Sequence, residues 1–181
     1  MKKLKGILFN NKGSGFPLAV AITLCLVMIF SGVSEYFRLM IIAQGVRNAL
    51  QDAVITTVND NYDNVYHGVR EGYSGGYQPI ASNFQESIDY GDIYNQLDEI
   101  LGLEQSGGEH VKYDSNRETQ LKIYNLTVNI ENAPIASGDT AGQRFEINST
   151  IVLEVPVSFA GKVLPTMRIQ VRNSAGYTPK F

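Results

Sequence analysis

The stretch NNKGSGFPLAVAITLCLVMIFSGVSEYF, residues 10–37, decides how this chain is organised. A segment rich in lysine and glycine is followed by nineteen residues without a charge, from Phe16 to Ser34. Glu35, immediately after this run, is the first acidic residue of the chain. A membrane-spanning helix needs about 20 apolar residues, and the run just meets that length. The sequence therefore predicts a transmembrane helix over residues 16–34.

Two features bear on whether the apolar run is retained in the mature protein. The h-region of a secretory signal peptide is about 7–15 residues long, which is shorter than this run, and Tyr36 and Phe37 lie where interfacial aromatic residues usually lie. Gly32 and Ser34, however, are small residues at a possible cleavage spacing before Glu35. We expect a retained anchor, and an ordinary signal peptide cut before Glu35 stays as the alternative.

The charge differs on the two sides of the run. Residues 1–34 hold four of the fifteen basic residues and none of the eighteen acidic ones, so the remainder carries eleven basic against eighteen acidic residues. Because basic residues beside an apolar span stay in the cytoplasm, we expect a cytoplasmic leader (residues 1–15) and an acidic extracytoplasmic domain. Nucleic acid is not an expected partner, since its binding requires a basic face.

Apolar residues continue beyond Glu35 with helical spacing. They form one stripe, made of Tyr36, Leu39, Met40, Ala43, Val46, Leu50, Ala53, Val54 and Thr57. Arg38 and several other polar residues lie opposite. No proline occurs between Pro17 and Pro79, so we expect one unbroken helix to about residue 60, amphipathic over residues 35–60 and about 65 Å long in all. The stripe residues expected to pack this helix include Leu39, Met40, Ala43, Leu50 and Val54.

The remaining residues, 61–181, are predicted to form an exported α+β domain. Residues 59–82 are rich in Asn, Asp, Gly and Tyr, which is typical of a loop. A second helix is expected over residues 83–103, although Gly91 disfavours it. The sequence EQSGGEH, residues 104–110, is expected to end that helix.

From Thr119 onward, apolar residues alternate with polar ones. The alternating segments are residues 124–130 (Tyr124, Leu126, Val128 and Ile130), 144–159 and 167–171. Short connections between such strands favour an antiparallel sheet with one face on a core, and Pro156 indicates an edge or a bulge. The helical stripe is the natural cover for that face. The predicted fold is thus a long N-terminal membrane-spanning helix packed at its outer half against a small antiparallel β-sheet, with one short extra helix.

The sequence contains no recognisable constellation of catalytic or ligand-binding residues. His67 and His110 both fall in predicted loops, where we expect them on the surface. No spacing typical of a zinc site occurs. Asn59, Asn61 and Asp63 resemble the start of a calcium loop, but the required glycine and glutamate are misplaced. We expect neither an enzyme nor a metal or cofactor site.

The segment KGSGFPLAV, residues 12–20, resembles the processing site of type IV prepilins: a short basic leader, a glycine, and a phenylalanine that begins a long apolar helix. The resemblance implies that a prepilin peptidase cuts between Gly15 and Phe16. It also implies a continuous helix, half embedded in the membrane and half packed on an antiparallel sheet. The fifth mature position is Val20, where the family usually has a glutamate that neutralises the amino terminus of a neighbouring subunit. Some minor or tip-located pseudopilins lack this glutamate.

The chain is also similar in layout to the TadE-like pseudopilins of tight-adherence pili, although Glu35-Tyr36, the pair nearest to their processing motif, lies at the far end of the apolar run. We therefore expect a minor pilin-like or TadE-like subunit of a bacterial pilus or secretion system that acts by assembly. The resemblance implies the lipid bilayer, other pilin-like subunits, an inner-membrane assembly platform with its ATPase, and a prepilin peptidase as partners. The alternative is a membrane-anchored or secreted binding domain that uses its tyrosine-rich loop, with Tyr62, Tyr66, Tyr73 and Tyr77.

Overall fold

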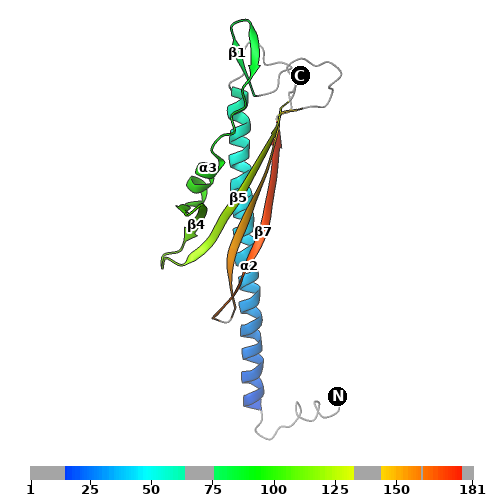
Figure 1. Ribbon diagram of the computed structural model, residues 1–181. Coiled ribbons are helices and arrows are strands. Elements are labelled where there is room, and N and C mark those ends of the chain that lie inside the picture. The colour runs from blue at the N-terminus through cyan, green and yellow to red at the C-terminus, as the bar shows by residue number, and fades with distance from the viewer. Residues whose placement is uncertain (1–14, 64–75, 133–143, 160, 177–181) are drawn as a thin grey trace.

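One long helix forms the axis of the molecule. The computed structural model describes residues 15–63, 76–132, 144–159 and 161–176. Helix α2 (Gly15–Asp63) has 49 residues, which at about 1.5 Å each make it about 74 Å long. A sheet packs along its upper half, and its lower half projects alone (Figure 1). The prediction that the apolar helix continues outward without a break is confirmed, and the helix ends three residues beyond the expected position.

The sheet is a five-stranded antiparallel meander. Its strands are ordered β3-β4-β5-β6-β7, with bounds β3 (Glu104–Ser106), β4 (Glu109–Tyr113), β5 (Thr119–Glu131), β6 (Glu146–Phe159) and β7 (Lys162–Gly176). A short helix, α3 (Ile93–Leu101), packs against α2. A separate hairpin of β1 (Tyr77–Ile80) and β2 (Asn83–Glu86) lies at the upper end of α2 (Figure 1). This is the α+β fold predicted from the sequence.

The core lies between α2 and one face of the sheet. Every second residue of the segment around β6 is fully buried against α2, which contacts both β6 and β7. The largest buried apolar side chains of the core are Phe145, just before β6, Ile123, Ile147, Ile151, Leu153 and Val155 from the sheet, and Val46, Leu50, Val54 and Leu97 from the helices. The apolar face of β6, formed by every second residue, therefore packs on the apolar stripe of α2, formed by residues three and four positions apart.

The residues at the lower end of the predicted stripe do not pack against the sheet as expected. Tyr36 and Met40 are 63% and 50% exposed, so the prediction that they pack in the stripe is wrong. Arg38, expected opposite the stripe, instead donates to the Pro156 carbonyl of the sheet. Met40 lies at the flank of the helix beside β7, where it lines a surface groove with residues 169–172 rather than the core. Glu35 and Arg38 line a separate pocket with residues of the β4–β5 region and of β6.

A bulge divides strand β5. Leu121 and Ile123 face the core, whereas beyond the bulge the core-facing residues are Leu126, Val128 and Ile130. Asn125 adopts φ +53° and inserts the extra residue that changes the parity. The prediction that Tyr124 shares a face with Leu126 is therefore wrong, since its side chain lies on the outer face.

The predicted helix over residues 83–103 is shorter than expected. Residues 83–86 pair with β1 as a strand. Gly91 adopts φ +60°, and the Asp92 side chain caps the amide of Asn95, so the helix begins only at Ile93. Residues 104–110 do not simply end the helix but form the β3–β4 hairpin. Its two-residue loop, Gly107-Gly108, has two positive φ angles, which suit a tight hairpin turn.

Pro156 lies at an irregularity in the long β6–β7 hairpin. The register of β6 with β7 shifts between Val155 and Val157. Proline lacks the amide donor that a regular ladder needs, so a bulge is one of the few places in a sheet that accept it. The prediction of an edge or a bulge at Pro156 is confirmed, and the extra residue lies on β7, opposite Pro156.

Candidate functional site: the exposed apolar half of helix α2

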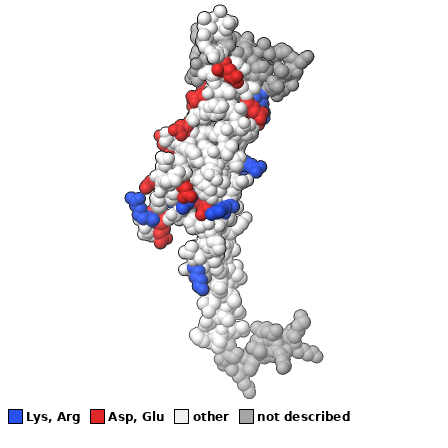
Figure 2. Space-filling view, viewed as in Figure 1, with Lys and Arg blue, Asp and Glu red and all other residues white. Residues whose placement is uncertain are grey.

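The projecting half of α2 is the largest unusual surface of the molecule. Residues 16–34 carry no charge, and large apolar side chains are exposed around the whole circumference of the helix. They include Phe16, Ile22, Leu24, Val27, Ile29 and Phe30. In Figure 2 the basic and acidic side chains lie over the sheet-bearing part, while the projecting end of the helix is free of them. Water is a poor solvent for such a surface.

This segment has the length and composition of a membrane span. Among the described residues, α2 is the one helix that is long and apolar enough to cross a membrane, and no residue of its apolar window is buried by the domain. A helix satisfies its own backbone hydrogen bonds, as a bilayer requires. The hydroxyl of Thr23 also donates to the Ala19 carbonyl at 2.9 Å. The segment therefore leaves few polar groups unpaired.

The sheet first meets α2 at the end of the apolar run. Phe159 lies beside the helix here, because a Cβ atom placed on Gly32 would be at van der Waals distance, 3.4 Å, from its Cε2. One turn further along, Glu35 and Arg38 form an ion pair with a distance of 2.7 Å. Glu35 Oε1 accepts the amide of Ser158 at 2.9 Å. Together with the bond from Arg38 to Pro156, these contacts form a polar latch between α2 and the β6–β7 hairpin.

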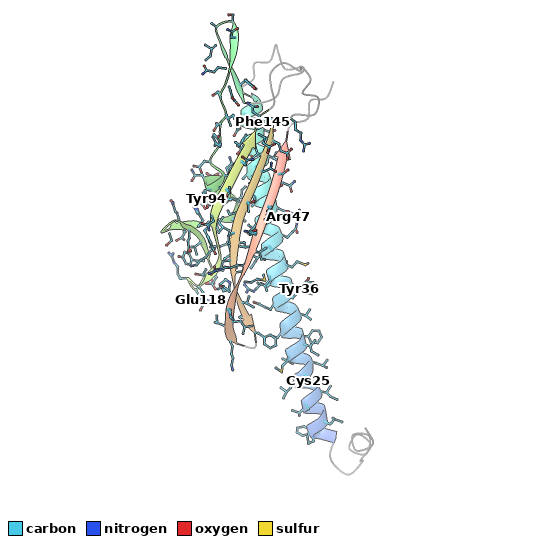
Figure 3. The ribbon with its side chains drawn as sticks, turned by 45° about the vertical axis from the view of Figure 1, so that its right-hand side comes forward. Cys25, Tyr36, Arg47, Tyr94, Glu118 and Phe145 are labelled. Atoms are coloured by element: carbon cyan, nitrogen blue, oxygen red, sulfur yellow. The ribbon has the colours of Figure 1, made fainter. Side chains whose placement is uncertain are left out.

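A shallow groove runs along the flank of α2 above the latch. It is lined by Met40, Ala43, Gln44 and Arg47 of the helix and by residues 169–172 of β7. Figure 3 labels Arg47 on the helix beside the sheet. Within the part of the chain that the structure describes, β7 pairs with β6 on one side and has no strand on the other. This flank therefore offers both a groove and an unpaired strand edge.

The predicted packing residues divide among three environments: the core, the apolar half of α2 and the groove. Leu50 and Val54 are fully buried, and Leu39 and Ala43 are partly buried against the core. Val20 lies on the free apolar span and is exposed. Met40, as described above, lines the groove.

The predicted processing site lies at the lower end of α2. Gly15 is its first residue, and Phe16 is 79% exposed. Residues 1–14, which include most of the leader, lie outside the described residues. Of the tyrosine-rich loop, Tyr66 and Tyr73 also lie outside them, whereas Tyr77 belongs to β1.

A polar pair that the sequence does not predict joins His110 to Asp98. His110, predicted as a surface loop residue, lies on β4 and is buried. Its Nδ1 is 2.7 Å from Oδ1 of Asp98 on α3, and its ring stacks on Tyr94 with centroids 4.1 Å apart. The hydroxyl of Tyr94 accepts the amide of Leu126. These contacts tie α3 to the sheet. His67 lies outside the described residues.

On the outer face of the sheet, Glu154 joins three strands. It accepts hydrogen bonds from Arg168 at 2.7 Å and from the hydroxyl of Tyr124 at 3.1 Å. The bond from Arg168 in particular lowers the pKa of the Glu154 carboxyl, and the bonds from Thr166 and Tyr124 act in the same direction against desolvation. This cluster is solvated at the Arg168 end and stabilises the sheet rather than forming a cleft.

Across the described residues, no group of three or more His, Cys, Asp or Glu side chains is placed to hold a metal ion. Comparisons of the chain with protein-family models, with curated proteins and with solved structures find no match. The class of protein is accordingly defined by the fold and the surface: an α+β domain carried on a helix apolar enough to span a membrane.

Proposed function

We propose that this protein is a minor pilin-like or TadE-like subunit of a bacterial pilus or secretion system, which acts by assembly rather than by catalysis. The observation that carries the proposal is the exposed, charge-free surface of α2 over residues 16–34, continuous with the helix that holds the domain core. Such a surface requires either lipid or other apolar helices around it. A pilin-like subunit uses both environments, the bilayer before assembly and neighbouring helices afterwards.

The orientation follows from charge. The four lysines before the span would keep the amino terminus in the cytoplasm, and the acidic domain would lie outside. The partners are then the lipid bilayer, other pilin-like subunits, an inner-membrane platform, and the prepilin peptidase at the site between Gly15 and Phe16.

The charges of the two sheet edges support side-by-side assembly. Strand β7, at one edge, carries Lys162, Arg168 and Arg172 and no acidic residue, and Arg47 lies in the adjacent groove. Residues 86–118, which include α3 and the β3–β4 edge, carry nine acidic and two basic residues. If subunits pack side by side in the same orientation, the basic β7 edge of one lies against the acidic edge of the next. Such a head-to-tail contact can repeat along an open filament.

Amino-terminal sequencing of the protein purified from membranes tests the proposal. Co-expression with a prepilin peptidase should give a mature protein that begins at Phe16, and Gly15→Leu should block the cut. A protein that begins at Glu35 would contradict both the anchor and the pilin-like function. An intact Met1 in the presence of the peptidase would favour the anchored binding domain instead.

Val20 bears on the number of copies in an assembly. A charge in the bilayer centre costs roughly 2.5–3.5 kcal/mol on insertion scales and is retained where a partner offsets it. With valine at this position, the subunit offers no carboxylate to the amino terminus of the next subunit. We therefore expect few copies, at a filament end or in the basal complex. Quantification against a major pilin in sheared surface material tests this, and near-equal abundance along the fibre would contradict it.

A further inference from the structure

The end of the β6–β7 hairpin extends beyond the rest of the sheet toward the apolar span. We define the hairpin tip by four residues, Phe159, Lys162, Val163 and Leu164. Figure 1 shows this hairpin reaching down alongside α2 to a level that no other strand reaches. Phe159 lies beside Gly32, where an added Cβ atom would be 3.4 Å from the ring, and Gly32 belongs to the last turn of the charge-free run.

The depth of the tip follows from the length of the span. Residues 16–34 measure about 28 Å at about 1.5 Å per residue, close to the roughly 30 Å of a bilayer's hydrocarbon core. If Phe16 lies at one boundary of the hydrocarbon, Gly32 and Ser34 lie at the other. The hairpin tip is beside Gly32 and therefore lies at the boundary between acyl chains and headgroups.

The side chains of the tip suit that boundary. Val163 is 83% exposed and Leu164 is 42% exposed, so apolar side chains point away from the domain core at this level. Phe159 is partly buried. Lys162, which is exposed, can extend its charged end toward lipid phosphates while its methylene groups stay near the apolar layer. The four tip residues themselves carry no acidic group, although Glu35, Asp114 and Glu118 line the same pocket as Val163.

We propose that the hairpin tip inserts into the interfacial layer of the same bilayer that α2 crosses, so that the protein contacts lipid at two places. This rests on the part of the proposed function in which α2 spans the membrane. The polar latch holds the tip rigidly against the helix. A second contact restricts rotation of the domain about the helix axis, which a single helix alone leaves free. The domain is then held with one face toward the membrane.

Tryptophan fluorescence offers a direct test, because the chain contains no tryptophan. Val163→Trp places a single reporter at the tip of the full-length protein. Leu24→Trp reports on the middle of the span, and Thr127→Trp, at an exposed position of β5, is the control outside the membrane. Each variant is reconstituted at high dilution in vesicles of phosphatidylcholine and phosphatidylglycerol, with and without lipids brominated at shallow or deep acyl positions.

We expect Val163→Trp to show blue-shifted emission and stronger quenching by shallow than by deep bromines. Leu24→Trp should be quenched most by deep bromines, and Thr127→Trp by neither. A second reporter, Leu164→Trp, repeats the measurement from the opposite face of the strand, and far-ultraviolet circular dichroism confirms that each variant folds.

Three outcomes would overturn the inference. If Leu24→Trp is quenched but both tip reporters behave like Thr127→Trp, α2 spans the bilayer and the tip lies in water. If the tip reporters are blue-shifted without bromine quenching, and the shift grows with protein density in the vesicles, a second copy covers the tip. If Leu24→Trp is also unquenched, α2 is outside the bilayer and the anchoring part of the proposed function fails as well.

Discussion

Leu50 provides the sharpest test of how the domain depends on helix α2. Its side chain is fully buried in the core between α2 and the sheet. Leu50→Ala removes three carbon atoms and leaves a cavity that the rigid helix and sheet cannot close completely. Substitutions of this kind cost about 2–5 kcal/mol. For a domain of this size, 1 kcal/mol corresponds to about 2–4 °C in the midpoint of thermal unfolding, so we expect a decrease of roughly 4–20 °C.

The measurement uses a fragment that begins at Glu35, which omits the apolar span and keeps the part of α2 that faces the sheet. Urea unfolding followed by circular dichroism gives the free energy of unfolding of each variant. Ile41→Ala is the matched control, since Ile41 belongs to the same helix and is 69% exposed. It should change stability by less than about 0.5 kcal/mol. Equal and small effects of Leu50→Ala and Ile41→Ala would refute the reasoning and would indicate that the stripe faces another subunit.

Three further perturbations address the polar contacts. Glu35→Ala removes the acceptor of the Ser158 amide, so hydrogen exchange at that amide should accelerate at least several-fold, while exchange in the middle of the sheet stays unchanged. The pKa of Glu154 is lower in the folded than in the unfolded protein, so its contribution to stability is present above about pH 4.3, the unfolded value, and is lost as the pH falls through the folded value. Glu154→Gln should therefore lower the urea midpoint at pH 7 more than at pH 3, and an equal loss at both would contradict the assignment. Asp98→Ala leaves the buried histidine without its carboxylate and should cost about 1–3 kcal/mol, whereas the same change at the exposed Glu99 should be nearly neutral; similar values for the two would exclude a role for the buried pair.

The parts of the fold that could be predicted are those with long, uninterrupted periodicity. Helix α2 and strand β6 repeat their apolar spacing over many residues, so their faces and their mutual packing followed from the sequence. The failures are local changes of backbone geometry. Asn125 adopts a positive φ angle and thereby changes which residues of β5 face the core. Asparagine tolerates this angle, but its presence in a sequence does not predict it. The pair Gly107-Gly108 is typical of a tight hairpin turn, whereas the prediction places the end of a helix there.

The features of the candidate site also fall into those that the sequence predicts and those that it does not. The charge-free span is visible in the sequence because its composition alone sets it apart. The burial of His110 is not, because it depends on Asp98 and Tyr94, which lie twelve and sixteen residues earlier in the chain. The latch between Glu35 and the hairpin joins residues 123 positions apart. Long-range polar contacts of this kind leave no local periodicity that a sequence reading could detect.

If α2 spans a bilayer as proposed, the latch lies within the single turn in which the helix passes from lipid to water. Below it, α2 is apolar on every side, and at Glu35 the first charges of the helix appear. An unpaired charge so close to hydrocarbon would be costly, but Glu35 is paired with Arg38 and accepts a backbone amide as well. A displacement of one turn, about 5.4 Å, toward the membrane would bury both charges in hydrocarbon. The same displacement away from it would expose the last apolar turn to water. In the proposed arrangement, the depth of the helix is therefore limited in both directions at the position where the sheet begins.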